Sequence, residues 1–488
     1  MLRSQLVFSR SQPILSALSL ERRVAGISAM TVALYYATWL LQGSLARGGT
    51  GLMWLVVLYT STTLLIFWAY GALIAMSWRG ELHGRARLGA LLVPVLLNLA
   101  FLAWVPSLSQ DTMSYLAHGL LAQLPGHNPL LDPVQQVRES AFGTALSTHD
   151  WSTSPGITPY GILWTRVEIL IAALCGTNIT AGVLLFKVIA VLANLGSAFL
   201  IWKVLGRIHP SMQLTGTLAY LWNPLVLTEL CAEGHNDAVM IFFSIAAVAA
   251  AITSRPGVSV IAQLLGALSK YICILFLPSQ LVFLWRTQSD RRRLVLEVLI
   301  AVVVTTALLV LLYAPLWAGA HSLDGLTQRP YPFGAVTFFG LIRWLLKHTA
   351  LSALAGAATA MLVTSLLCVL IIRCTARVRD AAGLVRSCAW ISLAFLLVVS
   401  PDYWPWYACM AIAWICIADP KRWFWLVLLL SMAGRLTGPL DILRIEGHLG
   451  RELSKGLITG MGALLPLFAL IMWEIMSRVR RSTEARPA

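Results

Sequence analysis

The sequence has few charged residues for its length. Of 488 residues, 12% are charged and 58% are hydrophobic, whereas about a quarter of the residues of a soluble globular protein are charged. Apolar runs of about twenty residues recur along the chain, and each is long enough to cross a membrane as a helix. A membrane β-barrel would instead show short segments of alternating polarity. The composition therefore excludes a soluble protein and predicts an all-α integral membrane protein.

The sequence also lacks the common motifs of metal and nucleotide sites. Its eight cysteines form no CxxC pair and no cluster with histidine, and most lie within apolar runs, so we expect neither a disulfide framework nor a zinc site. No P-loop, GxGxxG, HExxH or GxSxG pattern occurs in a supporting context. The sequence thus requires no cofactor, although Asp111 and Asp237 could hold a divalent cation.

Basic residues are gathered in short clusters between the apolar runs. The net charge of +15 could indicate nucleic-acid binding, but clusters beside membrane spans are better explained by topology. We expect about fourteen spans, within a range of twelve to fourteen. They lie near residues 24–41, 52–77, 88–105, 181–203, 211–230, 237–254, 258–272, 273–286, 294–316, 351–373, 386–400, 403–418, 422–434 and 456–476.

Segment 160–175 is ambiguous, because it is short and carries Arg166 and Glu168. If it lies along the membrane interface, most basic residues fall on one side of the membrane. If it spans, that alternation breaks from Lys203 onward. The positive-inside rule therefore favours an interfacial segment and cytoplasmic termini.

This topology divides the chain into three parts. Residues 1–23 show no clean cleavage site, so we expect a retained cytoplasmic segment rather than a signal peptide. Residues 24–476 form the membrane domain, and residues 477–488 form a basic cytoplasmic tail. Within the domain, residues 106–180 are expected to be a long first extracytoplasmic loop with interfacial helices.

The longest stretch too polar for lipid runs from Pro106 to Pro159, in that loop. Asp111 stands near its beginning, just before an amphipathic run from Thr112 to Leu124. Aspartate is a common helix cap. It could also be a carboxylate placed to deprotonate a hydroxyl acceptor, and one residue can do both.

A second polar cluster, Glu233-Gly234-His235-Asn236-Asp237, lies between two apolar spans on the same predicted face. Polar groups so close to lipid are costly unless they are functional. Asn236 or Asp237 could simply cap the next span, whereas His235 and Asn236 favour a functional interpretation.

Lys270, between two apolar half-spans, needs an anionic partner at that depth. A lipid phosphate would serve, and so would an internal carboxylate such as Glu229. Lys187 is expected to snorkel or to pair within the bundle. Arg329 is a further candidate for phosphate binding.

The stretch from Ser400 to Tyr407 combines Asp402 with four aromatic residues, among them Trp404 and Trp406. It could belong to the aromatic belt of the membrane interface. Equally, it could offer a stacking surface for sugar rings.

These stretches together resemble the GT-C glycosyltransferases, most closely the bacterial polyprenol-phosphate-mannose-dependent α-mannosyltransferases. The matching stretches are Asp111–Tyr115, Gly126–Pro129, Pro159–Trp164, Trp222–Pro224, Gly234–Asp237, Lys270–Tyr271 and Pro401–Tyr407. The resemblance implies a GT-C-type bundle in which 160–175 is a juxtamembrane helix and Asp111 is the general base. Donor- or acceptor-binding residues would be Tyr115, His127, Asn128, Tyr160, His235, Asn236, Asp237, Lys270, Arg329, Asp402, Trp404 and Trp406.

The expected function is inverting transfer of a sugar, mannose by the resemblance, from a polyprenyl-phosphate donor to a glycan or glycolipid acceptor. It would occur at the extracytoplasmic face of the bacterial inner membrane, with the lipid bilayer but no nucleic acid as a partner. One alternative is a transporter or flippase of lipid-linked sugars, which commonly shows repeats and ionisable residues at the membrane midplane. The one-sided polar clusters favour an enzyme. Another alternative is a GT-C enzyme using glucose, arabinose or aminoarabinose, because sugar choice depends on pocket shape.

Overall fold

The structure is a computed structural model that describes residues 8–47, 51–107, 109–149, 156–327, 337–350, 352–400, 403–445 and 447–484. These residues form α-helices joined by short 3₁₀ and π segments, with no strand among them. The prediction of an all-α membrane protein is confirmed. Two predicted site residues, Arg329 and Asp402, lie outside the described residues.

The N-terminal half contains three long helices, a loop with three short ones, and a bundle that includes a broken helix. The helices are α1 (Phe8–Arg47), α2 (Leu52–Trp78), α3 (Gly84–Ala100), α4 (Asp111–Leu121), α5 (Ala141–Ser147), α6 (Ile162–Cys175), α7 (Ile179–Ile208), α8 (Gln213–Leu221), α9 (Pro224–Val226), the π-helix η4 (Leu227–Ala232), α10 (Asp237–Ile252) and α11 (Pro256–Ser269).

The C-terminal half continues the bundle. Its helices are η5 (Tyr271–Phe276), α12 (Leu277–Thr287), α13 (Arg291–Tyr313), α14 (Asp324–Thr327), α15 (Phe338–Lys347), α16 (Ala355–Ala376), α17 (Ala381–Ala394), η9 (Phe395–Val399), α18 (Tyr407–Ala418), α19 (Phe424–Ile445), α20 (Arg451–Thr459), η10 (Gly460–Leu464) and α21 (Leu465–Glu484).

Nine helices in the described part of the chain are long and apolar enough to cross a membrane, or ten if the bent pair 224–232 and 237–252 is one span. Three shorter apolar helices lie at 256–269, 271–287 and 407–418. Helices occupy all the expected span positions, but the total of about fourteen stays a prediction, because the shorter helices do not reach spanning length. The ambiguous segment 160–175 forms α6, which is not among the candidate spans.

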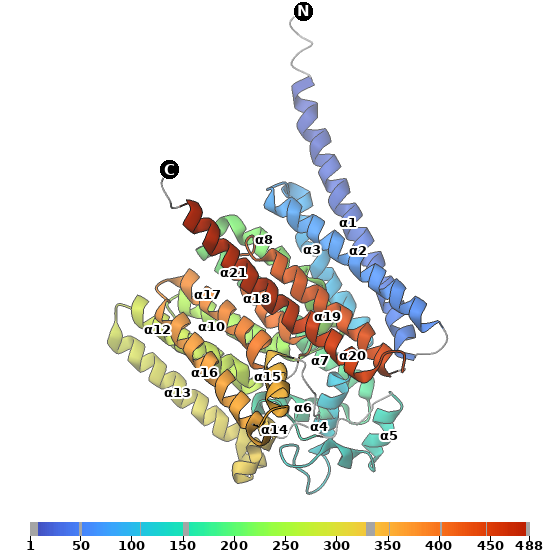
Figure 1. The fold of residues 1–488 in the computed structure, drawn as a ribbon, viewed down its shortest axis with the longest axis vertical. Helices are drawn as coiled ribbons and strands as arrows, with labels where there is room; N and C mark the ends of the chain where they lie inside the picture. The colour runs from blue at the N-terminus through green and yellow to red at the C-terminus, as the bar shows by residue number, and fades with distance from the viewer. Residues whose placement is uncertain are drawn as a thin grey trace, which may run out of the picture.

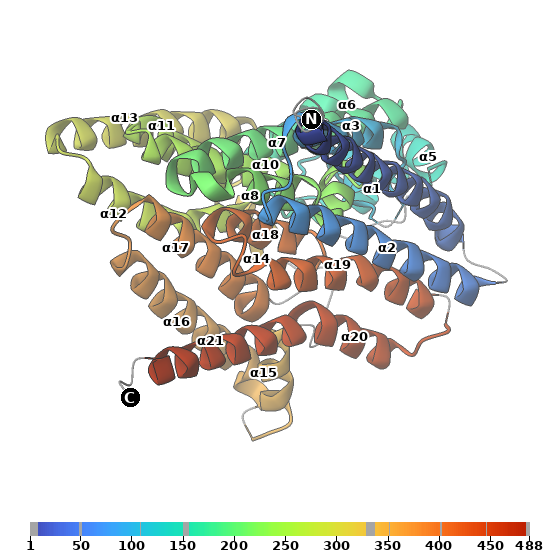
Figure 2. The ribbon, with the colours of Figure 1, turned by 90° about the horizontal axis from the view of Figure 1, so that it is seen from above.

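The long helices run roughly side by side, with the loop helices gathered at one end (Figure 1). Helices α4, α5 and α6 lie at that end, whereas α1 begins and α21 ends at the opposite one. Seen from above, α13 and α11 lie along one edge and α20 and α21 along the other, with α18 between them (Figure 2). All residues from Ala408 to Ile417 of α18 are buried, whereas α13 buries only Leu294, Ala301 and Thr305.

The break after α9 brings a polar turn to the loop end of the bundle. Helix α9 begins at a proline, and the Asn223 side chain caps it by accepting the N–H groups of Leu225 and Val226 at 3.0 and 3.1 Å, as is common at helix starts. The chain then bends by 115° before α10. Gly234, with φ of +78°, supplies the left-handed residue that this turn requires.

Candidate active site

The predicted general base lies where the start of the long loop meets the turn between η4 and α10. Asp111 is the first residue of α4, and the cap position before it is occupied by Gln110, whose side chain makes no capping hydrogen bond. The Oδ2 atom of Asp111 instead accepts hydrogen bonds from the hydroxyls of Tyr160 at 3.2 Å and Tyr115 at 3.4 Å. The capping interpretation of Asp111 is therefore wrong. The structure gives its second oxygen, Oδ1, no hydrogen bond within the described residues.

Burial raises the pKa of Asp111 above its ordinary value. The positive charge of Lys270 and the two tyrosine hydrogen bonds oppose the rise, and the charge of Asp237 adds to it. A raised pKa makes a carboxylate a stronger base once it is ionised. Asp111 thus combines a position at a helix start with the chemistry of a proton acceptor.

Tyr115 connects the base to the turn before α10. Its hydroxyl accepts the backbone N–H of Asn236 at 3.3 Å and lies 3.4 Å from the Asn236 side-chain oxygen. Its ring meets Tyr160 and Trp164 edge-on, with ring centroids 5.1 and 5.2 Å apart. The predicted residues Asp111, Tyr115, Tyr160 and Asn236 therefore form one cluster. Asn236 occupies the cap position of α10 but makes no side-chain capping bond.

Lys270 pairs with Asp237 at 2.6 Å, not with Glu229. The ammonium group also lies over the ring of Tyr407, 4.8 Å from its centroid. Asp237 is almost fully buried, whereas the lysine side chain is 17% exposed. Within the described residues, Lys270 is thus the one cation paired with Asp237, and its charge also acts on the predicted base, Asp111. Its ammonium group remains partly accessible.

His235 lies between the loop and the aromatic stretch. Its Nε2 atom shares a hydrogen bond with the Ser109 hydroxyl at 3.1 Å, and its ring lies 3.9 Å from the Trp406 ring, centroid to centroid. Trp406 in turn stacks on Trp404 at 5.0 Å. The predicted histidine and both tryptophans therefore form a continuous row of rings beside the loop start.

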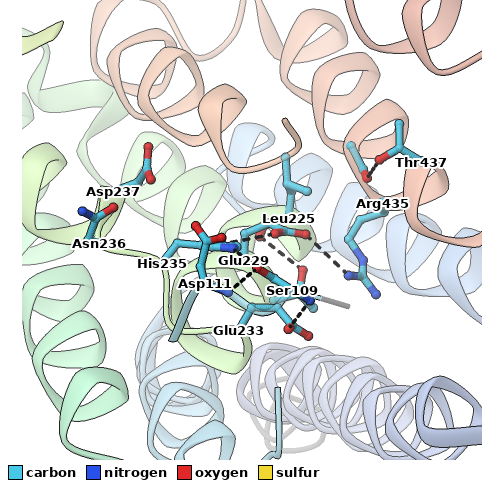
Figure 3. A network of polar contacts seen from close by, with 12 residues as sticks. Ser109, Asp111, Leu225, Glu229, Glu233, His235, Asn236, Asp237, Arg435 and Thr437 are labelled. Atoms are coloured by element: carbon cyan, nitrogen blue, oxygen red, sulfur yellow. Dashed lines mark hydrogen bonds and ion pairs between the residues drawn. The ribbon is translucent and has the colours of Figure 1, made fainter. Parts of the chain in front are cut away.

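Two buried glutamates, Glu229 and Glu233, lie close to His235 and Ser109 (Figure 3). Glu233 accepts hydrogen bonds from the loop backbone at Ser107 and Ser109, both at 3.1 Å. Glu229 lies 3.9 Å from Arg435 and 3.9 Å from the His235 ring. Arg435 also donates to the hydroxyl of Tyr59 on α2, so the partners of this buried arginine are groups of the protein.

Two predicted site residues are engaged elsewhere in the loop. Asn128 donates its side-chain amide to the carbonyl of Leu316 at 2.8 Å and accepts the N–H of Leu130 at 3.0 Å. His127 lies 3.4 Å from Asp132. Neither has a described contact with the Asp111 cluster, so the structure gives both a role in shaping the loop.

Reasoning from sequence did not place Glu233 or Ser109 among the site residues, although both lie in stretches that it singled out. Lys187 was expected to snorkel or to pair within the bundle. Its ammonium is buried and donates to the carbonyls of Phe101, Leu102 and Trp104, so Lys187 is bound within the bundle and does not snorkel. Gln42 of α1 is a further residue that was not predicted to belong to the site, and it donates to Glu233 at 2.7 Å. A polar residue at the end of an apolar span was the only signal for it.

Among the described residues, no group of three or more His, Cys, Asp or Glu could hold a metal ion.

The fold and site define a multi-pass membrane protein with an acid–base cluster at one end of its helix bundle. Comparison with known proteins identifies its class. Residues 20–286 match the MptA_B family, described as alpha-(1->6)-mannopyranosyltransferase, N-terminal domain.

Two relatives carry the same name. The chain is 27% identical over 432 residues to alpha-(1->6)-mannopyranosyltransferase A of Mycobacterium tuberculosis. The matched region covers 79% of this chain and 76% of that protein. It is 28% identical over 140 residues to alpha-(1->6)-mannopyranosyltransferase A of Corynebacterium glutamicum, covering 28% of this chain and 26% of that protein. The chain belongs to the alpha-(1->6)-mannopyranosyltransferase family and is a glycosyltransferase. The transporter alternative is therefore set aside.

Proposed function

We propose that the protein transfers mannose from a polyprenyl-phosphate donor to a glycan or glycolipid acceptor, with inversion and with Asp111 as general base. The observation that carries this proposal is the Asp111 carboxylate, held by two tyrosine hydroxyls at the loop end of a membrane bundle. The family and the names of its relatives favour mannose and an α-(1→6) linkage.

The acceptor hydroxyl must lose a proton as it attacks, because its own pKa is far above neutrality. A nearby carboxylate can take that proton within the transition state. Tyr160 and Tyr115 fix Oδ2, which leaves Oδ1 to face the incoming hydroxyl. Their hydrogen bonds hold the orientation of the carboxylate while its raised pKa preserves its basicity.

The leaving phosphate needs stabilisation of its negative charge rather than a strong acid. Lys270 supplies a cation at the site, and its charge acts on Asp111. The stacked Trp404 and Trp406 rings offer an apolar face for the donor sugar. The chain thus provides a base, a cation and a ring platform within one cluster.

Bond changes follow from a single displacement. The bond between the mannose anomeric carbon and the phosphate oxygen breaks, and its electron pair leaves with the phosphate. A bond forms from the acceptor oxygen to the same carbon, and the acceptor proton moves to Asp111. Because one displacement inverts the anomeric centre, an α-linked product requires a β-linked donor.

The site is proposed to face the extracytoplasmic side of a bacterial inner membrane, with both termini cytoplasmic. The clustering of basic residues on the predicted cytoplasmic side supports this orientation. The fold adds only that the termini and the site lie at opposite ends of the bundle, since α1 begins and α21 ends opposite to α4, α5 and α6 (Figure 1).

Asp111→Asn tests the proposal, because it keeps the shape of the side chain but removes the base. We expect transfer of labelled mannose from polyprenyl-phosphate mannose into glycolipid to fall on the order of 100-fold or more. The measurement compares initial rates in purified enzyme reconstituted in liposomes.

Glu139→Gln, an exposed substitution in the same loop, is the matched control and should keep the wild-type rate. Normal turnover by Asp111→Asn would refute the assignment of the base. If the wild type transfers no mannose, polyprenyl-phosphate glucose is the next donor to test, and transfer from it would correct the sugar.

A further inference from the structure

A buried glutamate, Glu233, holds the beginning of the loop but has no role in the proposed chemistry. Its side chain is almost fully buried. Oε2 accepts the backbone N–H groups of Ser107 and Ser109, each at 3.1 Å, and Oε1 accepts the Gln42 amide at 2.7 Å. These three hydrogen bonds compensate for the loss of water around the carboxylate.

Ser109 passes this restraint on to the base. Its hydroxyl accepts the backbone N–H of Asp111 at 3.2 Å and shares a hydrogen bond with His235 at 3.1 Å. Figure 3 shows Ser109 between Glu233, Asp111 and His235. The backbone before Asp111 is irregular, so its N–H groups need partners outside a helix. Glu233 and the Ser109 hydroxyl provide them.

The turn that carries Glu233 also packs tightly against the loop. A Cβ atom on Gly234 would lie 2.9 Å from the Thr112 methyl carbon and 2.9 Å from Cγ of Lys187. The Lys187 ammonium binds the carbonyls that end the preceding helix. Lys187 therefore holds the carbonyls just before the loop, and Glu233 holds the N–H groups at its beginning.

We propose that Glu233 is a positioning residue: by binding the N–H groups of Ser107 and Ser109, it fixes where α4 begins and where the Asp111 carboxylate points. This inference rests on the proposed function, because it takes Asp111 as the base. A shift of about 1 Å in a catalytic group can lower a rate on the order of 100-fold. Loss of Glu233 should therefore slow turnover without removing any group that binds the donor.

The experiment measures kcat and the KM for polyprenyl-phosphate mannose in purified, reconstituted variants. Glu233→Ala should lower kcat on the order of 100-fold while leaving the donor KM nearly unchanged. Glu233→Gln keeps an oxygen that can accept both N–H groups, so it should recover most of the rate. Ser109→Ala, which leaves the backbone contacts of Glu233 in place, should lower kcat on the order of tenfold.

Glu297→Ala is the matched control. Glu297 also accepts a backbone N–H, that of Gly257 at 3.1 Å, but this contact joins α13 to the start of α11, and Glu297 has no described contact with the Asp111 cluster. This variant should keep the wild-type kcat. Comparing the kcat of Glu233→Ala with that of Glu297→Ala shows whether losing a glutamate that binds backbone N–H groups slows turnover only at the site.

A normal kcat in Glu233→Ala, a change in KM alone, or a Gln variant as slow as the Ala variant would overturn the inference. If Glu233→Ala does not fold, Glu233→Asp decides, because its side chain is one methylene shorter and draws the carboxylate back from both N–H groups: a wild-type kcat overturns the inference, and a fall in kcat at constant KM supports it. Asp111→Asn is measured alongside. An active Asp111→Asn refutes the proposed function itself, whereas an inactive one with a normal Glu233→Ala refutes only the positioning role.

Discussion

Lys270 and Asp237 form an ion pair whose charges both act on Asp111. The pair is close, at 2.6 Å, and the aspartate is the more buried partner. Removing one member of such a pair costs on the order of 3 kcal/mol, because the other charge stays buried without a partner. A single substitution at Lys270 would therefore change the stability of the protein and its affinity for the donor at the same time.

Combining Lys270→Ala with Asp237→Asn separates the two effects. We expect Lys270→Ala to lower both the thermal stability and the affinity for a short-chain polyprenyl-phosphate mannose. Adding Asp237→Asn removes the uncompensated charge and should restore most of the stability, because no buried ion is left unpaired. Donor affinity should stay low, because the cation is still missing. Thermal unfolding and equilibrium binding in detergent measure the two quantities.

A double variant with wild-type donor affinity would show that Lys270 is structural. Arg286→Ala serves as the control, because Arg286 is a cation of α12 that binds the backbone carbonyls of Ala376 and Val378. It should leave donor affinity unchanged.

The same residues show what sequence could and could not reveal. Hydropathy placed Lys270 at a depth where a cation needs a partner, and the structure supplies one. The internal partner suggested from sequence was Glu229, and the structure pairs Lys270 with Asp237 instead, because the choice depends on how helices are rotated about their axes. The capping expectation for Asp111 failed for a related reason. A cap is a local signal, whereas the partner Tyr160 is 49 residues away in the chain.

At the scale of helices, α4 and α6 pack face to face in the loop. A Cβ atom on Gly119 of α4 would lie 2.1 Å from the Glu168 carbonyl oxygen, so the glycine is needed for the close approach. Beside it, His118 of α4 lies 3.8 Å from Glu168 of α6, and both side chains are buried. Burial raises the pKa of Glu168 to about 7. The helix pair that carries the proposed base thus contains a second titratable carboxyl group.

This raised pKa predicts a pH dependence of stability. Between the unfolded pKa of about 4.3 and the folded value of about 7, the folded state binds the proton more tightly than the unfolded state. Stability should therefore fall as pH rises through that interval. Glu168→Gln, which stays neutral, should flatten this part of the profile and stabilise the protein above neutrality. Thermal unfolding in detergent from pH 5 to pH 9 measures it.

Glu139→Gln, on the exposed part of the same loop, should keep the wild-type profile. An unchanged slope in Glu168→Gln would show that Glu168 is ionised in the folded protein at these pH values.

Helix positions were largely predictable, since apolar runs and prolines mark them. The expected amphipathic run Thr112–Leu124 corresponds to α4 (Asp111–Leu121), and a helix begins at Pro224. The π-helix η4 and the 115° bend that follows were not predicted. Both depend on how the turn at Gly234 fits between Thr112 and Lys187, which no local pattern reveals.

At the scale of the whole molecule, α1 begins at the end of the bundle opposite to α4, α5 and α6 (Figure 1). The first two helices also contribute to the buried polar network, through Gln42 to Glu233 and through Tyr59 to Arg435. They are therefore part of the support of the site, a point that composition and spacing left open. The orientation of this assembly in the membrane follows from charge rather than from the fold.

Thiol accessibility tests that orientation. We expect a cysteine at Glu139, in the loop, to react with a membrane-impermeant maleimide in intact spheroplasts. A cysteine at Arg292, at the start of α13, should react only after the membrane is permeabilised. Both positions are exposed, so burial does not account for a difference between them. Cys368, the exposed native cysteine, is replaced by serine in both variants to lower the background. Reaction of Arg292→Cys but not Glu139→Cys in intact spheroplasts would reverse the orientation and place the Asp111 site on the cytoplasmic face.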